Sequence, residues 1–345
     1  MKRKHRAKRR YHVRLSKPFL KKPLIAAAAG ICLILLAISS IKVFRYAADE
    51  ISQRNSANDL RALYYADADA SGPEGEGAAA LETAAASFAS DDAQEPGPAR
   101  SLIAMLYDSI AAENNKDAAE EEEAYLPAQS YPLNRYGIIY SRFEKLRRQN
   151  KDIIGWLTIV DMLDQAVVKR DNEYYLRRDS LGYHNVNGAL FLDENCDLSV
   201  RPYTYIIYGH NMKNGDMFGS LRKYENVSYY KNNPFITFDT MHEDGEYIVF
   251  AASKISIVPG MENYINIREL SQMSVREREE AIERIRKYSF FKVNLDIQAD
   301  DQLLLLVTCD GDDNERLIVS ARRIRENEGK PQLENMIQNA FKGSL

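Results

Sequence analysis

Hydrophobic and polar positions follow three different patterns along the chain, and each predicts a different kind of structure. From Leu24 to Ile41 the sequence LIAAAAGICLILLAISSI carries no charge over 18 residues, enough for a helix of roughly 27 Å against a hydrocarbon core of about 30 Å. The following stretch to residue 130 shows no steady period, and short apolar runs return after it. We therefore predict four regions: a basic tail (1–23), a transmembrane anchor (24–44), an acidic, Ala-rich and largely disordered spacer (45–130) and one folded domain (131–345).

Within the folded domain, short apolar runs separated by polar breaks predict a mainly β structure. An amphipathic helix is expected first, from Ile138 to about Asn150, because apolar side chains recur there at helical spacing. The strands predicted after it are Ile154 to Ile159, Gln165 to Val168, Ala189 to Leu192, Tyr203 to Tyr208, Phe235 to Asp239, Tyr247 to Ile257, Leu303 to Thr308 and Arg316 to Ala321. Eight short strands indicate a barrel or a sandwich. A charged amphipathic helix, Ser274 to Tyr288, is expected between the sixth and seventh strands.

Charge is distributed very unevenly along the chain. The first 45 residues carry 13 Lys/Arg and no Asp/Glu, while the remaining 300 carry 33 Lys/Arg against 50 Asp/Glu. Because basic residues favour the cytoplasmic side of a membrane helix, we expect a single-pass protein with a cytoplasmic N-terminus, an extracellular folded domain and membrane lipid as a partner. A cleaved signal peptide is the alternative, since the Ala37-Ile38-Ser39 triplet resembles a cleavage site, but the basic region before it is unusually long. Beside an apolar stretch, that region is better explained as an orientation signal than as a nucleic-acid-binding arm, so no nucleic acid is expected.

The spacer prediction rests on composition. Residues 46–130 hold 18 acidic and 4 basic side chains, with breaks rich in glycine and proline. The segment Ser101 to Ala112 has enough apolar residues for a short helix, either transient or docked on a partner or on the membrane.

The three cysteines, Cys32, Cys196 and Cys309, are too few and too far apart to indicate a disulfide framework or a cysteine-based zinc site, and we expect no metal and no cofactor. Cys309 differs from the others because it ends the apolar run LLLLVTC and precedes the acidic turn sequence DGDDNE. This pattern predicts a thiol at the end of a strand, near solvent. The neighbouring carboxylates would disfavour a thiolate, so a reactive cysteine needs a cationic partner.

Two residues could supply positive charge or hydrogen bonds beside that thiol. His210 follows the apolar run YTYIIY and opens a Gly-containing loop, so its ring is also expected at a strand end. Arg316 begins the strand after the Cys309 loop, where a hairpin would return its guanidinium to the thiol and to a developing oxyanion. Spacing alone leaves competitors that are expected to be ordinary surface or turn residues, namely His184, His242, Arg322, Arg323 and Arg325.

The segments that carry these residues resemble the signatures of class B sortases. YGHNMKNGDMFGSLRKY (Tyr208 to Tyr224) is similar to the histidine-bearing signature, and VTCDGDDNERLIVSAR (Val307 to Arg322) to the cysteine-bearing one. NKDIIGWLTI, DNEYYL and GALFLD occur in the family's order, so the resemblance covers the folded domain but not the spacer. Two departures, Leu305 in place of a common threonine and Ala166 in place of a common proline, remove no reacting group.

The resemblance implies an eight-stranded sortase-type β-barrel with an N-terminal helix and a helix in the connection between strands 6 and 7. It also implies a cysteine transpeptidase of the thiol peptidase class, in which Cys309 is the nucleophile, His210 transfers protons and Arg316 holds the oxyanion or the substrate backbone. The implied partners are secreted proteins with a C-terminal sorting signal and an amine of Gram-positive peptidoglycan. The implied substrate-binding residues are Asn172, Leu176, Tyr208, Ile257 and Thr308.

Three other functions are alternatives to peptidoglycan anchoring. A pilus-assembling sortase would use a lysine of a pilin subunit as its amine, and the sequence does not distinguish it. A catalytically silent sortase-fold scaffold conflicts with the retention of all three reacting residues. A papain-like hydrolase conflicts with the chain order, because its cysteine would precede its histidine.

Overall fold

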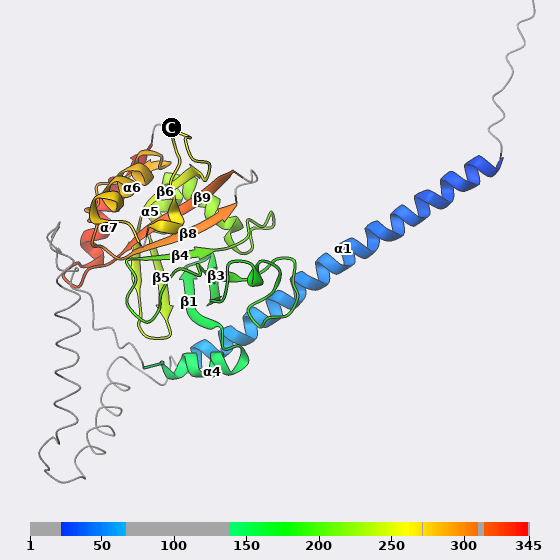
Figure 1. The fold of residues 1–345 in the computed structure, drawn as a ribbon, viewed down its shortest axis with the longest axis horizontal. Coiled ribbons are helices and arrows are strands. Elements are labelled where there is room, and N and C mark those ends of the chain that lie inside the picture. Colours follow the sequence, from blue (N-terminus) through cyan, green and yellow to red (C-terminus); the bar gives the residue numbers. More distant parts are fainter. Residues whose placement is uncertain (1–21, 67–137, 271, 310–313, 344–345) are drawn as a thin grey trace, which may run out of the picture. The chain divides into compact units, whose positions relative to one another are not determined.

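The structure is a computed structural model that describes residues 22–66, 138–270, 272–309 and 314–343 (Figure 1). Residues 1–21 of the predicted basic tail lie outside the described residues. The same holds for the predicted spacer from residue 67 onward, including its segment Ser101 to Ala112. The chain divides into two compact units, Met1–Asp49 and Glu50–Leu345, and each is described by itself.

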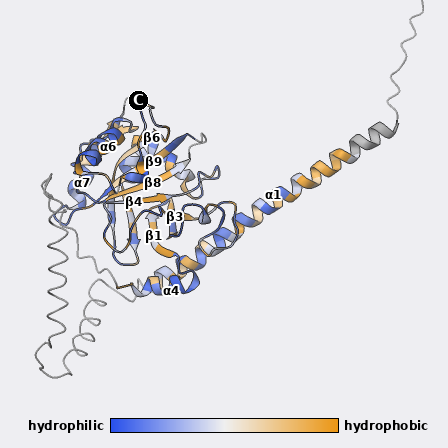
Figure 2. Ribbon diagram, in the orientation of Figure 1, coloured by the Kyte–Doolittle hydropathy of each residue, from blue (hydrophilic) through white to orange (hydrophobic). Residues whose placement is uncertain are grey.

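The first unit contributes the apolar part of one long helix, α1 (Lys22–Tyr65). Among the described residues this is the one helix long and apolar enough to cross a membrane. Large hydrophobic side chains such as Leu33, Leu36 and Phe44 are exposed along it, and Figure 2 shows hydrophobic residues dominating this part of the helix. An exposed apolar surface of this length is compatible with the predicted anchor.

Eight strands of the second unit form a closed barrel, which decides between the two β architectures that the sequence pattern allowed (Figure 1). Their bounds are β1 (Ile153–Ile159), β2 (Leu163–Val168), β3 (Leu190–Leu192), β4 (Thr204–Tyr208), β5 (Phe235–Thr240), β6 (Glu246–Ser256), β8 (Leu303–Cys309) and β9 (Glu315–Arg323). Their order around the barrel is β1-β2-β3-β4-β8-β9-β6-β5, with β2–β3 and β4–β8 parallel and the other pairs antiparallel. Each of the eight predicted strands is confirmed, with ends shifted by one or two residues.

Helices flank and connect these strands. Their bounds are α4 (Ser141–Gln149), α5 (Val227–Asn232), α6 (Val275–Lys287) and α7 (Lys330–Gln338), with 3-10 helices η1 (Tyr174–Arg177), η2 (Phe218–Glu225) and η3 (Ile267–Glu269). The predicted N-terminal helix is α4, and the helix predicted between the sixth and seventh barrel strands is α6, so both are confirmed. α6 begins at a capping box in which the side chains of Ser274 and Glu277 each accept a backbone N–H of the other. Helix α7 and a separate pair formed by β7 (Phe291–Lys292) and β10 (Phe341–Lys342) were not predicted.

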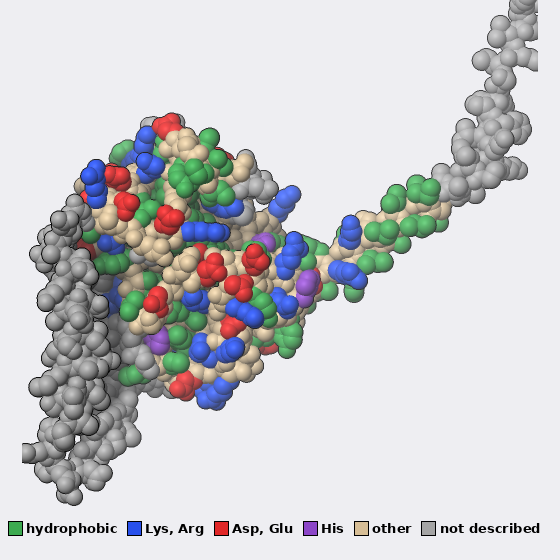
Figure 3. All heavy atoms as spheres, viewed as in Figure 1, with side chains coloured by type: hydrophobic (Ala, Val, Ile, Leu, Met, Phe, Trp, Pro, Cys, Tyr) green, Lys and Arg blue, Asp and Glu red, His purple; other side chains and the backbone are tan. Residues whose placement is uncertain are grey.

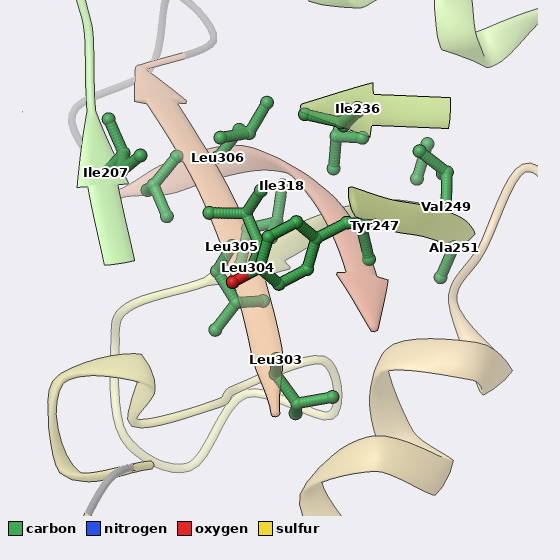
Figure 4. Close-up of a cluster of buried hydrophobic side chains, with 14 of the residues drawn as sticks. Ile207, Ile236, Tyr247, Val249, Ala251, Leu303, Leu304, Leu305, Leu306 and Ile318 are labelled. Atoms are coloured by element: carbon green, nitrogen blue, oxygen red, sulfur yellow. The ribbon is translucent and has the colours of Figure 1, made fainter. Parts of the chain in front are cut away.

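Strand β8 is buried on both faces. The run Leu303 to Leu306 is at most 2% exposed, which explains why this strand shows a continuous apolar run and no alternation. Figure 4 shows these leucines among side chains of the neighbouring strands, including Ile207 of β4, Ile318 of β9 and Tyr247 of β6. In contrast, Figure 3 shows acidic and basic side chains interspersed over the visible surface of this unit. The hydrophobic core therefore lies around β8, and most charged side chains lie outside it.

The part of α1 that belongs to the second unit corrects the spacer prediction. Residues 50–65 are helical and pack against the barrel, where Leu60 and Tyr64 are at most 5% exposed. The Tyr64 ring stacks on Trp156 of β1 with ring centroids 4.5 Å apart, and its hydroxyl donates to Asp239 Oδ2 at 2.5 Å. The prediction of disorder from residue 45 was wrong here, because composition averaged over the spacer hid two large apolar side chains one helical turn apart.

Replacing Tyr64 with alanine tests this packing. The variant loses a buried ring, its stacking on Trp156 and its hydrogen bond to Asp239, so we expect the free energy of unfolding to fall by about 3 kcal/mol. Chemical denaturation of the full chain in detergent, followed by circular dichroism, measures the change. Tyr65→Ala is the matched control, because Tyr65 is 40% exposed and its loss should cost less than about 1 kcal/mol. Equal losses in the two variants would contradict the packing.

Candidate active site

The pairing of β4 with β8 brings the predicted histidine and cysteine to one edge of the barrel. The two strands run parallel with Tyr208 opposite Val307, and Gly209 N donates to Val307 O at 3.2 Å. His210 and Cys309 each follow two residues later, so the same register brings their backbones to the same level. Parallel strands end at the same edge of a sheet, which explains how residues 99 positions apart become neighbours.

The hairpin of β8 and β9 returns Arg316 to the same edge. In its antiparallel register Cys309 lies opposite Arg316, whereas Leu303 lies opposite Arg322 at the other end of the strands. Arg322 is buried there and donates two hydrogen bonds to Glu328 at 2.6 and 2.7 Å, which gives it a structural role. The other two competing arginines also form ion pairs, Arg323 with Glu243 and Arg325 with Asp301. The strand register therefore favours Arg316 over Arg322, Arg323 and Arg325 as the arginine beside Cys309.

Close packing fixes the backbone on both sides of His210. A Cβ atom on Gly209 would lie 2.6 Å from Leu190 and 2.7 Å from Phe218, so a larger residue before the histidine would collide with the core. After the histidine, Phe218 N donates to His210 O at 3.0 Å and closes the loop on itself. Phe218 and Met217 are buried and anchor the end of this loop. The histidine is therefore held in place from two directions.

A cavity of about 360 Å³ opens at this edge. Its lining residues are Asn172, Leu176, Phe191, Tyr208, Gly209, His210, Asn211, Arg268, Val307, Thr308 and Arg316. Six of the predicted site residues are among them, and Cys309 directly follows the lining residue Thr308. Ile257 is partly exposed beyond the end of β6 and is not a lining residue. Sequence reasoning missed Arg268 and Phe191, because a single arginine in a turn and an aromatic residue in a core strand carry no motif that marks them.

A buried carboxylate organises one wall of this cavity. Asp193 is fully buried, and its Oδ2 accepts from the Tyr208 hydroxyl at 3.0 Å and from Asn172 Nδ2 at 3.1 Å. Burial and the nearby Asp193 charge raise the pKa of Tyr208, so its hydroxyl stays protonated. Asn172 Oδ1 in turn accepts from Glu194 N at 3.0 Å. Asp193 therefore fixes the Asn172 amide and the Tyr208 hydroxyl at the cavity wall.

The surroundings of His210 favour its neutral form. Burial lowers the pKa of His210, and the positive charge of Arg177 on η1 lowers it further. Both effects act against the imidazolium, because one removes its hydration and the other repels its charge. At neutral pH His210 is therefore mostly neutral, and an imidazolium beside a thiolate would be a minor form.

Comparisons with known proteins give related descriptions for this chain. The family model described as the sortase domain matches residues 160–324. Sortase B of Listeria monocytogenes is 26% identical over 199 residues, which cover 57% of this chain and 78% of that protein. Sortase B of Staphylococcus aureus is 24% identical over 218 residues, which cover 62% of this chain and 87% of that protein.

Solved structures similar to this chain have related descriptions. A Bacillus anthracis crystal structure, described as similar to sortase B, is 29% identical, with a TM-score of 0.48, and the match covers 63% of this chain and 98% of that one. A complex of Staphylococcus aureus sortase B with its substrate is 23% identical, with a TM-score of 0.48, and covers 55% of this chain and 88% of that one. The family-model match and the two curated relatives together show that the folded part of this chain is similar to the sortase domain, and to sortase B proteins in particular.

Proposed function

We propose that this chain is a membrane-anchored sortase that cleaves the C-terminal sorting signal of secreted proteins and joins them to an amine of cell-wall peptidoglycan. The observation that carries the proposal is the register of three adjacent strands, which brings His210, Cys309 and Arg316 to one end of the barrel. The adjoining cavity of about 360 Å³ supports a role in binding a short peptide segment.

In the first step, the Cys309 thiolate attacks the carbonyl carbon of a threonine in the sorting signal. The new carbon–sulfur bond leaves an oxyanion, whose charge the Arg316 guanidinium stabilises. When the carbon–nitrogen bond breaks, the His210 imidazolium donates its proton to the departing amine. The result is a thioacyl-enzyme and a released C-terminal peptide.

In the second step, an incoming amine attacks the thioester carbonyl. Neutral His210 accepts the proton of that amine, and Cys309 leaves as a thiolate. One amide bond has then been exchanged for another, so the reaction consumes no water. A pilus-assembling sortase would differ only in the amine, a pilin lysine, whereas a silent scaffold would carry out neither step.

The proposed enzyme is attached to the membrane through the apolar part of α1. The apolar part of α1 is long enough to span a bilayer, and the basic residues before it favour a cytoplasmic N-terminus. A secreted protein whose sorting signal is held in the same membrane would meet the enzyme at a raised effective concentration. This proximity would offset the small fraction of reactive thiolate–imidazolium pairs, and we expect slow turnover of soluble peptides.

A panel of fluorogenic sorting-signal peptides, incubated with the full chain in detergent, tests the reaction. We expect cleavage of at least one peptide and a thioacyl adduct at Cys309, detected by mass spectrometry and absent from Cys309→Ala. His210→Gln and Arg316→Gln should each lower kcat/KM at least about 100-fold, because each removes a group that acts in the transition state. Cys196→Ala is the control and should keep the adduct, since that thiol is buried. The absence of an adduct with every peptide would favour the silent scaffold.

Replacing Arg177 with glutamine tests the electrostatics of the histidine. Without the guanidinium the imidazolium is no longer repelled, so the pKa of His210 should rise, while the effect of burial remains. The imidazole titration, followed by NMR and assigned with His210→Gln, and the limb of the kcat/KM profile that reports this group should both move to higher pH. Arg178→Gln is the control, because Arg178 stacks on Tyr174 and does not contribute to the shift. An unchanged titration in Arg177→Gln would refute this account.

A further inference from the structure

Arg268 reaches the cavity from the connection between β6 and α6. It lies in η3, a single turn whose backbone is fixed by the buried side chains of Ile265, Ile267 and Leu270. Between these anchors Arg268 is exposed and lines the cavity together with His210 and Arg316. A guanidinium is therefore held at the cavity wall by residues that do not themselves line it.

No described carboxylate contacts the guanidinium of Arg268 directly. Its guanidinium lies close enough to the Tyr208 hydroxyl to lower the pKa of that neutral group, whose own proton is donated to Asp193. Asp193 also accepts from Asn172, and the ion pairs among the described residues do not include one between Arg268 and a carboxylate. The described lining of the cavity includes Arg268 and Arg316 and no acidic side chain. The described part of the cavity lining therefore presents positive charge to a ligand.

We propose that Arg268 selects sorting signals that carry an acidic side chain within a few residues of the cleaved bond. This inference rests on the proposed function and names the substrate chemistry of that same site. A planar guanidinium forms two parallel hydrogen bonds with a carboxylate, a geometry that an amide or an ammonium group cannot match. A lysine at the same position of the peptide would be repelled by Arg268, so the site would discriminate by rejection as well as by attraction.

The test measures charge preference position by position. Starting from a cleaved peptide of the panel, each residue flanking the scissile bond is replaced in turn by Glu, Gln and Lys, and kcat/KM is measured with the full chain in detergent. For one position we expect the wild type to prefer Glu over Lys at least about tenfold. The full chain retains the acidic segment that follows Cys309, so any charge that it adds is included in the measured preference.

Variants of Arg268 show whether this residue causes the preference for Glu over Lys peptides. In Arg268→Gln the ratio of Glu to Lys peptides should approach one, and in Arg268→Glu it should invert. Arg276→Gln is the matched control, since Arg276 lies on α6, contacts Glu280 and does not line the cavity; it should keep the wild-type ratio. Thermal unfolding of each variant checks that the barrel is intact, and a ratio within one variant does not depend on its overall activity.

A binding measurement separates this inference from the proposed reaction. Fluorescence anisotropy of labelled panel peptides and their Glu, Gln and Lys variants, including parent peptides that are not cleaved, with the full-length Cys309→Ala variant reports charge selection without chemistry. Preferential binding of the Glu peptide without any adduct in the wild type would support the role of Arg268 and overturn the transpeptidase proposal. A wild-type preference below twofold at every position, or a preference that survives in Arg268→Gln, would overturn the role of Arg268.

Discussion

The hydrogen-bonded pairing of β8 between β4 and β9 is the constraint on which the rest of the site depends. Parallel pairing on one side and antiparallel pairing on the other fix three strand ends at one edge of the barrel. A slip of one residue in either pairing would turn every side chain of β8 to the opposite face and remove the match between His210, Cys309 and Arg316. The leucines of β8 oppose such a slip, because the surrounding core packs against both faces of the strand.

The arginines around the cavity have opposite effects on an anionic ligand and on the charge of His210. Positive charge at Arg316 and Arg268 suits an oxyanion or a carboxylate, but positive charge at Arg177 makes an imidazolium less stable. The buried Asp193 carboxylate is hydrogen-bonded to Tyr208 and Asn172, and it is not among the groups that shift the pKa of His210. Among the described residues, the cavity therefore combines a mostly neutral histidine with the arginines Arg268 and Arg316, an arrangement suited to binding an anionic group.

Helix α1 contains an apolar part that is long enough to cross a membrane and, from Glu50 on, residues of the folded unit. Its last turns belong to the core of that unit, since Tyr64 covers Trp156 and donates to Asp239. Burial raises the pKa of Asp239 to about 6, and the hydrogen bond from Tyr64 opposes that rise. The helix therefore stabilises a carboxylate that the barrel alone would leave buried with fewer donors. Composition does not reveal this role, because the residues that follow the helix are acidic and rich in alanine.

The sequence by itself determined the eight strands, helices α4 and α6, the apolar span and the motifs around His210 and Cys309. Local periodicity and strand-end residues carry that information, because each depends on near neighbours in the chain. Only the tertiary structure decided between barrel and sandwich, separated Arg316 from Arg322, Arg323 and Arg325, and brought Arg268 to the cavity. It also showed that residues 50–65, which the sequence analysis predicted as spacer, contribute side chains to the core. These outcomes depend on pairings between residues far apart in the chain, and the register of such pairings is set by packing of the whole barrel.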